Sequence, residues 1–127
     1  MLGDKARSIL SEPVFAHLAV IADGRPHVTP VWVDVEGDRV LVNTALGRKK
    51  DAALQVGAPV ALSVTAPDNP YEMVMIQGHV VERTTEGADH DIDRLAKKYL
   101  GADTYPFRQE GEERVTILIE ADHVVGA

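Results

Sequence analysis

Three consecutive cations, Arg48, Lys49 and Lys50, stand between a predicted strand at residues 39–43 and a predicted helix at residues 47–56. A helix start carries unpaired backbone N–H groups and a partial positive charge, so cations there oppose the helix dipole. A bound anion such as a phosphate would offset this unfavourable arrangement. The alternative is a basic turn in solvent, which costs roughly a few tenths of a kcal/mol. This stretch by itself leaves both interpretations open.

Trp32, the single tryptophan, offers a flat aromatic surface on a strand predicted for residues 27–35. Its side of the alternating pattern also carries Pro30 and Asp34. Pro30 cannot donate a ladder hydrogen bond, so we expect this strand at a sheet edge or bulged at that point. Trp32 is interpreted either as barrel core or as a wall against a flat ring. His27, which follows the preceding turn, is a further candidate for ligand contact.

Several kinds of chemistry lack the residues they need. The chain has no cysteine, so it forms no disulfide and offers no thiolate nucleophile or cysteine-ligated metal. Its five histidines show no metal-motif spacing on a helix. It contains no Gly-x-Ser-x-Gly hydrolase motif, no Gly-x-Gly-x-x-Gly motif and no Walker-type loop. A nucleotide-like cofactor would therefore be held in neither a Rossmann nor a P-loop manner.

Length and composition predict a single globular domain over residues 1–127, with 45% apolar residues. The net charge of −7 argues against nucleic acid as the main partner. No segment approaches the ~20 apolar residues of a membrane helix, and no apolar run follows the first residues. We therefore expect neither a membrane span nor a signal peptide. The lack of cysteine suits a cytoplasmic protein, and the scarcity of lysine suggests a GC-rich bacterial genome.

Periodicity and turn signals predict six strands, of which that at residues 71–83 is long, and three helices. The predicted helices cover residues 3–11, 47–56 and 88–100, and the predicted strands cover residues 15–22, 27–35, 39–43, 60–65, 71–83 and 114–120. The last helix is the best defined, with acidic residues at its start, lysines at its end and Gly101 after it. Gly78 is expected to bend or bulge its strand. This order predicts a mainly β fold with α decoration, a small antiparallel barrel flanked by helices.

Four motifs resemble, in their order and spacing, the pyridoxamine 5′-phosphate oxidase-like split β-barrel superfamily. They are His-Val-Thr-Pro-Val-Trp-Val at residues 27–33, Asn-Thr-Ala-Leu-Gly-Arg-Lys-Lys at 43–50, Ala-Leu-Ser-Val at 61–64 and Gln-Gly-His-Val at 77–80. The runs at residues 95–101, 105–108 and 111–114 resemble its F420-dependent branch, which is largely actinobacterial. The resemblance implies a six-stranded antiparallel split β-barrel of Greek-key type. It also implies a homodimer that binds coenzyme F420, or alternatively FMN, at the subunit interface.

The resemblance implies roles for the residues at the basic turn. Arg48 and Lys50, with Lys49 as a neighbour that a shift of one residue in the alignment would bring in, correspond to the family's phosphate-binding cations. A guanidinium grips phosphate through two parallel hydrogen bonds, and an ammonium adds a point charge. Asn43 and Thr44 would add side-chain donors. These five residues are the predicted phosphate end of the cofactor site.

The resemblance also implies where the cofactor ring lies. The family's second strand runs along the ring, which corresponds here to Pro30, Val31 and Trp32. Gln77 is a further expected contact from a later strand. Vitamin B6 oxidation is disfavoured, because residues 123–127 do not match the Arg/His cluster that true pyridoxamine phosphate oxidases carry near the C-terminus.

These observations predict an F420-dependent oxidoreductase that transfers a hydride between the deazaflavin and a small organic acceptor. No catalytic acid or base is identified, and the proton would come from solvent, His27 or Tyr105. The alternatives are an FMN-binding flavin reductase or oxidase, a cofactor carrier without turnover, and a barrel that serves only as an interaction module.

Overall fold

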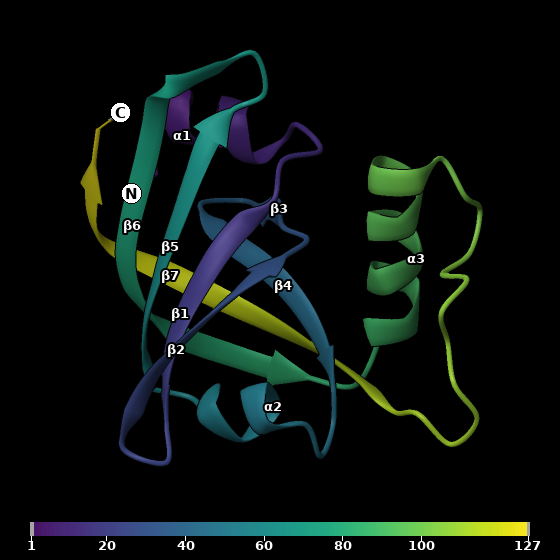
Figure 1. The fold of residues 1–127 in the computed structure, drawn as a ribbon. Helices are drawn as coiled ribbons and strands as arrows, with labels where there is room; N and C mark the ends of the chain where they lie inside the picture. The colour runs from purple at the N-terminus through teal and green to yellow at the C-terminus, as the bar shows by residue number, and fades with distance from the viewer. Residues whose placement is uncertain (1, 127) are drawn as a thin grey trace.

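The computed structural model describes residues 2–126, which form one antiparallel sheet of seven strands and three helices (Figure 1). The strands are β1 (Ala16–Ala22), β2 (Arg25–Val31), β3 (Asp34–Glu36), β4 (Arg39–Ala45), β5 (Pro59–Ala66), β6 (Asn69–Thr84) and β7 (Arg114–Val125). The helices are α1 (Asp4–Leu10), α2 (Lys49–Ala53) and α3 (Ala88–Leu100). None of these helices combines the length and hydropathy that crossing a membrane requires.

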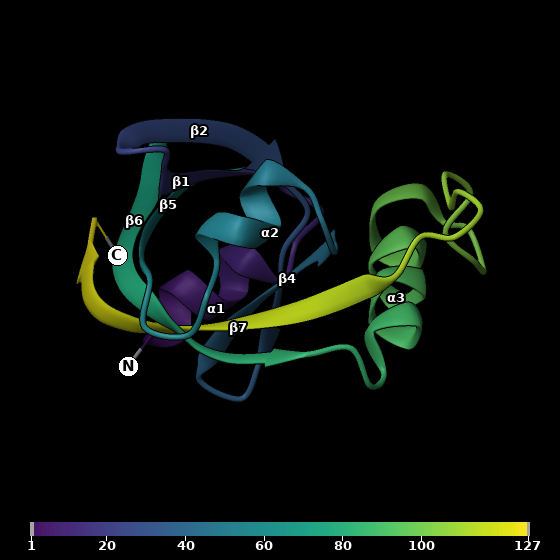
Figure 2. The same cartoon turned by 90° about the horizontal axis from the view of Figure 1, so that it is seen from below.

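The sheet curls around an aliphatic core, and Figure 2 shows its strands arranged around a ring. Strand β1 shows the pattern that makes this possible, because Leu18 and Val20 are buried whereas His17 and Ile21 face outwards. Helices α1 and α2 lie at the two ends of the ring, and α3 stands outside it (Figures 1 and 2). A second, smaller cluster joins α3 to β4 and β7 through Leu41, Ile92, Leu95 and Leu118.

Several predictions from the sequence are confirmed. Helix α3 has the predicted bounds, and Gly101 ends it in a left-handed conformation with φ 71°. Strand β2 is a sheet edge, as Pro30 requires. The register of β6 against β7 shifts at Gly78, where an added Cβ would lie 2.0 Å from the Glu120 carbonyl oxygen. The glycine is therefore required by the close approach of β7.

The strand predicted for residues 27–35 is wrong as a single element, because β2 and β3 lie at opposite edges of the sheet. The chain leaves the ladder after Val31, and the backbone of Val33 is hydrogen-bonded to α3 instead. Its N–H donates to the Tyr99 hydroxyl (2.9 Å), and its carbonyl accepts from the Lys98 ammonium (2.6 Å). The alternating pattern continues through this break, so periodicity alone could not reveal it.

The helix predicted for residues 47–56 is also wrong in extent, because α2 covers only Lys49–Ala53. Arg48 is still extended, with φ −75° and ψ 156°, and the helical geometry is lost at Leu54. The Arg83 guanidinium donates to the carbonyls of Asp51 (3.2 Å) and Leu54 (2.9 Å), so a side chain from β6 satisfies the end of the helix. The seven strands found, against six predicted, follow from the break at Val33.

Tyr99→Phe tests how much the break at Val33 depends on α3. The hydroxyl accepts from the Val33 N–H and donates to the Val14 carbonyl (2.5 Å), and burial raises the pKa of Tyr99, so it stays protonated. Its removal leaves two buried backbone groups without that partner, and we expect a loss of about 1–3 kcal/mol in the free energy of unfolding. Urea unfolding measures it, with the exposed Tyr71→Phe as matched control. Equal losses in both variants would contradict this role.

Candidate functional site

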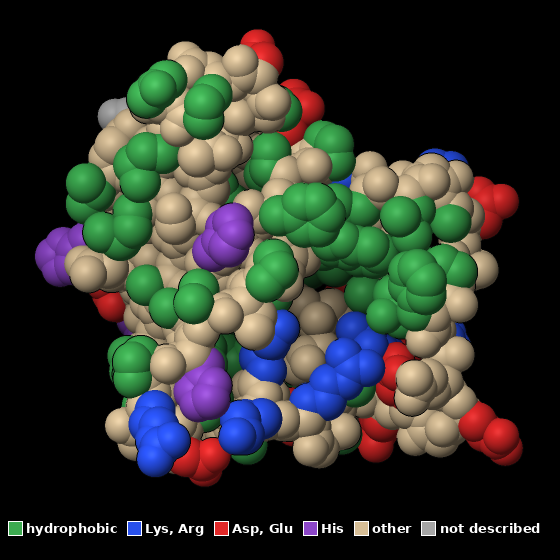
Figure 3. Space-filling view, in the orientation of Figure 1, with side chains coloured by type: hydrophobic (Ala, Val, Ile, Leu, Met, Phe, Trp, Pro, Cys, Tyr) green, Lys and Arg blue, Asp and Glu red, His purple; other side chains and the backbone are tan. Residues whose placement is uncertain are grey.

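Most of the predicted site residues lie in a groove between the barrel and α3, which we call the α3 groove. Its volume is about 240 Å³. In Figure 3 hydrophobic side chains gather over the hollow beside α3, and Lys and Arg side chains lie below them. Six of the nine predicted residues line the groove: Pro30, Val31, Trp32, Asn43, Arg48 and Lys50. The structure thus brings the predicted ring contacts and two of the predicted cations together.

One wall of the α3 groove is aromatic. The indole of Trp32 stacks on the ring of Tyr99, with centroids 5.1 Å apart and planes 7° from parallel. Tyr105 meets Trp32 edge-on at 6.0 Å, and Phe107 meets Tyr105 edge-on at 5.7 Å. Trp32 therefore packs with the α3 cluster and not in the barrel core, so the core interpretation is wrong. Tyr99 packs against one face of the indole, and Trp32 itself lines the groove.

The other end of the groove is cationic. Arg48 and Lys50 both line it, whereas Lys49 pairs with Asp23 at 3.3 Å and lies outside it. Burial lowers the pKa of Lys50, and the neighbouring charge of Arg48 lowers it further. Within residues 2–126 no carboxylate lies within ion-pair distance of Lys50. The site therefore holds positive charge that this chain does not fully compensate.

The start of α2 does not require a bound anion, which corrects one part of the sequence argument. Asp51, in the first turn, accepts a hydrogen bond from the Gly47 N–H at 3.0 Å. Its carboxylate also pairs with Arg83 at 2.6 Å. The negative charge that the helix start favours is thus supplied by the chain itself. The case for an anion rests on the side chains of Arg48 and Lys50 and not on the helix dipole.

A buried ion pair lies beside the α3 groove. Arg114 and Glu112 are almost fully buried, with side chains 3% and 6% exposed, and pair at 2.7 Å. The second oxygen of Glu112 lies 3.5 Å from the Arg48 guanidinium. Arg114 also donates from Nε to the Asn43 side-chain oxygen (2.9 Å), and its guanidinium lies 5.1 Å from the Tyr105 ring centroid. This pair therefore connects three residues that line the groove.

Sequence reasoning missed Glu112 and Arg114 as site residues. They belong to the run Gly-Glu-Glu-Arg at residues 111–114, which contributed only to the family resemblance. Hydrophobic periodicity cannot reveal this buried salt bridge, because it treats charged residues such as Glu112 and Arg114 as exposed. Nothing else in the sequence separates them from the surface charges nearby.

Three predicted site residues lie elsewhere. Thr44 is buried (3% exposed) and does not line the α3 groove. Lys49 borders a small pocket of about 110 Å³ that also contains His27. Gln77 lines a wide depression of about 540 Å³ on the outer face of the sheet, together with Ala19, Ile21, Pro26, Ala61 and His123. We call this the outer depression, and the assignment of these three residues to the cofactor stays a prediction.

The two suggested proton donors differ in position. Tyr105 lines the α3 groove, whereas His27 lies in the neighbouring small pocket with Lys49 and Lys50. No histidine of residues 2–126 lines the α3 groove. The geometry supports binding of a flat ring and an anion, and it contains no nucleophile paired with a base among the lining residues.

Comparison with solved structures shows the same fold in several other proteins. An F420 reductase aligns with 24% identity and a TM-score of 0.83, over 95% of this chain and 96% of that chain. An FAD and heme binding protein from Mycobacterium smegmatis aligns with 21% identity and a TM-score of 0.65, over 98% and 70%. A conserved hypothetical protein from Mycobacterium tuberculosis aligns with 20% identity and a TM-score of 0.70, over 98% and 82%.

Comparison at the level of sequence families is more specific. No protein of curated function matches the sequence. The model of a family described as pyridoxamine 5′-phosphate oxidase matches residues 3–125, almost the whole chain. The split-barrel fold and the family resemblance are thereby confirmed. With its sheet of seven strands, its open barrel and this match, the chain belongs to the pyridoxamine 5′-phosphate oxidase family.

Proposed function

We propose that this protein is an F420-dependent oxidoreductase, which transfers a hydride between the deazaflavin and a small organic acceptor. The observation that supports this most directly is that one groove joins an aromatic wall to two cations. F420 combines a flat ring with a phosphate, so the ring suits the aromatic wall of the groove and the phosphate suits the two cations. The likeness in fold to an F420 reductase supports the choice of the deazaflavin.

The residues of the α3 groove have separate tasks in this proposal. Bound F420 would supply the hydride, and the protein binds it, orients it and excludes water. Trp32, backed by Tyr99, offers a rigid face to the ring, and Pro30 and Val31 add apolar contacts. Arg48 offers paired hydrogen bonds to the phosphate, and Lys50 adds charge nearby.

FMN is the alternative cofactor, because it also joins a flat ring to a phosphate. The fold that this chain shares with an FAD and heme binding protein supports a flavin of this kind. The two cofactors are separated by titrating the purified protein with oxidised F420 and with FMN. Tight binding of F420 alone supports the deazaflavin proposal, and a yellow protein that prefers FMN overturns it. Turnover of reduced F420 with an acceptor separates an enzyme from a carrier.

Replacing Arg48 and Lys50 together with Ala tests the phosphate end. Charge-assisted hydrogen bonds contribute about 1.5–3 kcal/mol, so we expect the Kd for F420 to rise at least about tenfold. The fluorescence of the cofactor reports binding. Lys97→Ala is the matched control, because that lysine is exposed on α3, pairs with Asp103 and does not line the groove. An unchanged Kd in the double variant, with an unchanged melting temperature, would sink the assignment.

Trp32→Leu tests the ring end. Loss of the stacked ring removes about 0.5–1.5 kcal/mol beyond apolar burial, so we expect the Kd for F420 to rise about 3- to 10-fold. Inorganic pyrophosphate lacks the ring and should bind only the phosphate end. We expect it to compete with F420 equally well in wild type and in Trp32→Leu, and poorly in the variant with Arg48 and Lys50 replaced by Ala. If the Trp32 variant also loses pyrophosphate competition, the two ends of the groove do not act separately.

We also propose that the protein is a homodimer with the cofactor sites at the subunit interface. The outer face of the sheet supports this, because Ile21 and Val28 are 53% and 64% exposed there. Val28 lies opposite Ala19, which lines the outer depression, so these side chains share one face. We expect sedimentation equilibrium to give twice the chain mass for wild type and the monomer mass for Ile21→Asp. A monomeric wild type would contradict the proposal.

A further inference from the structure

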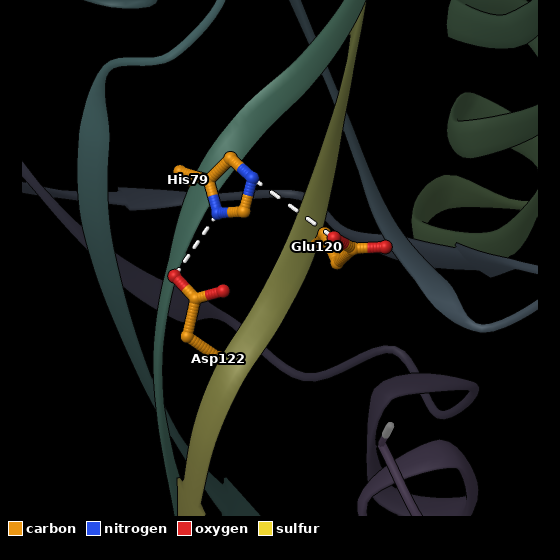
Figure 4. Close-up of side chains that lie close together, drawn as sticks. All are labelled: His79, Glu120 and Asp122. Atoms are coloured by element: carbon orange, nitrogen blue, oxygen red, sulfur yellow. Dashed lines mark hydrogen bonds and ion pairs between the residues drawn. The ribbon is translucent and has the colours of Figure 1, made fainter.

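Three ligand-type side chains converge on the outer face of β6 and β7, outside the α3 groove (Figure 4). The two ring nitrogens of His79 face two carboxylates. Nδ1 lies 3.0 Å from an oxygen of Asp122, and Nε2 lies 3.9 Å from an oxygen of Glu120. The ligand atoms of the three residues all lie within 4.8 Å of one another. The side chains are between 37% and 49% exposed in the single chain, and Asp122 also lines the outer depression.

The pairing of two strands produces this arrangement. His79 lies directly opposite Glu120 in the register of β6 and β7. Glu120 and Asp122 are two residues apart in β7 and therefore point to one face. Gly78 permits the close approach of β7 at this point, since any Cβ there would collide with the Glu120 carbonyl. His79 is 41 and 43 residues from its partners in the chain, which is why no sequence spacing indicates the cluster.

The charge of this cluster is not balanced by a basic side chain. Within residues 2–126 neither Glu120 nor Asp122 forms an ion pair with a Lys or Arg. Two other carboxylates of the chain do form ion pairs with arginine: Asp51 pairs with Arg83, and Glu112 pairs with Arg114. A cation at the His79 cluster would compensate both carboxylates.

The ligand chemistry separates this cluster from an ordinary acidic patch. Imidazole nitrogen is a preferred ligand of zinc and other divalent transition metals, whereas magnesium and calcium prefer oxygen alone. Bonds of about 2.0–2.2 Å to one ion place neighbouring ligand atoms roughly 3.0–3.5 Å apart. One ion can bind only one ring nitrogen of His79, and the ligand atoms of the three residues lie within 4.8 Å of one another. The partly exposed side chains therefore have to close by roughly 1–2 Å around the ion.

We propose that His79, Glu120 and Asp122 form a binding site for one divalent transition-metal ion, with Zn²⁺ as the probe. His79 supplies a ring nitrogen, and each carboxylate supplies an oxygen. Solvent completes the coordination. None of its three residues lines the α3 groove, and Asp122 lines the outer depression.

Titration of the tag-free, chelator-treated protein with ZnCl₂ in a calorimeter tests the site. We expect one Zn²⁺ per chain for wild type and at least about a tenfold weaker affinity for His79→Ala. Glu120→Gln and Asp122→Asn keep the shape of the side chains and should each weaken binding. Zn²⁺ should also raise the melting temperature of wild type and not that of His79→Ala.

Two control variants sharpen the test. His90→Ala removes an exposed histidine on α3 and should leave zinc binding unchanged. Arg48→Ala should leave zinc binding unchanged as well, which separates this site from the cofactor groove. Absence of saturable binding to wild type, or equal affinity in wild type and His79→Ala, would overturn the proposal. Equal losses in His79→Ala and His90→Ala would show nonspecific histidine binding and would also overturn it.

Discussion

The hydrogen bonds that α3 makes to the backbone of Val33 are the constraint on which the site depends. At this residue the chain leaves one edge of the sheet and crosses to the other. A crossing segment has no ladder partner, and unpaired buried backbone groups cost about as much as a lost hydrogen bond each. Tyr99 and Lys98 supply those partners from a helix outside the barrel. The same tyrosine stacks on Trp32, so the helix that stabilises the crossing also orients the aromatic wall.

Buried charge organises the other side of the groove. Arg114 and Glu112 are removed from water, and such a pair is stable only when both partners and their remaining hydrogen-bonding positions are satisfied. Asn43 accepts a hydrogen bond from the Nε–H of Arg114, and the ring of Tyr105 packs against the Arg114 guanidinium. Asp51 and Arg83 form a second internal ion pair at the short helix α2, where Asp51 also accepts a hydrogen bond from the Gly47 N–H. Glu112 is shared between Arg114 and Arg48, and Lys50 has no carboxylate at ion-pair distance within residues 2–126, so the groove keeps a net positive charge.

Local signals predicted the elements that have local causes. The helix at residues 88–100 has an amphipathic period, acidic and basic ends and a terminal glycine, and each of these acts within a few residues. Pro30 predicted a strand that is an edge or is bulged, since a residue without an N–H is disfavoured in a central strand, and β2 is an edge. The break at Val33 and the short α2 were not predictable in this way. Their partners, Tyr99, Lys98 and Arg83, are distant in the chain.

The sequence by itself determined the types of residue available: a flat aromatic side chain, a run of cations and a family motif order that identifies the fold. Only the tertiary structure decided which of them meet. It placed Arg48 and Lys50 in the groove and turned Lys49 away to Asp23. It also set His79 between two carboxylates of a neighbouring strand. The physical reason is that strand register and buried ion pairs are settled between segments far apart in the chain, whereas periodicity and turn chemistry are settled within one segment.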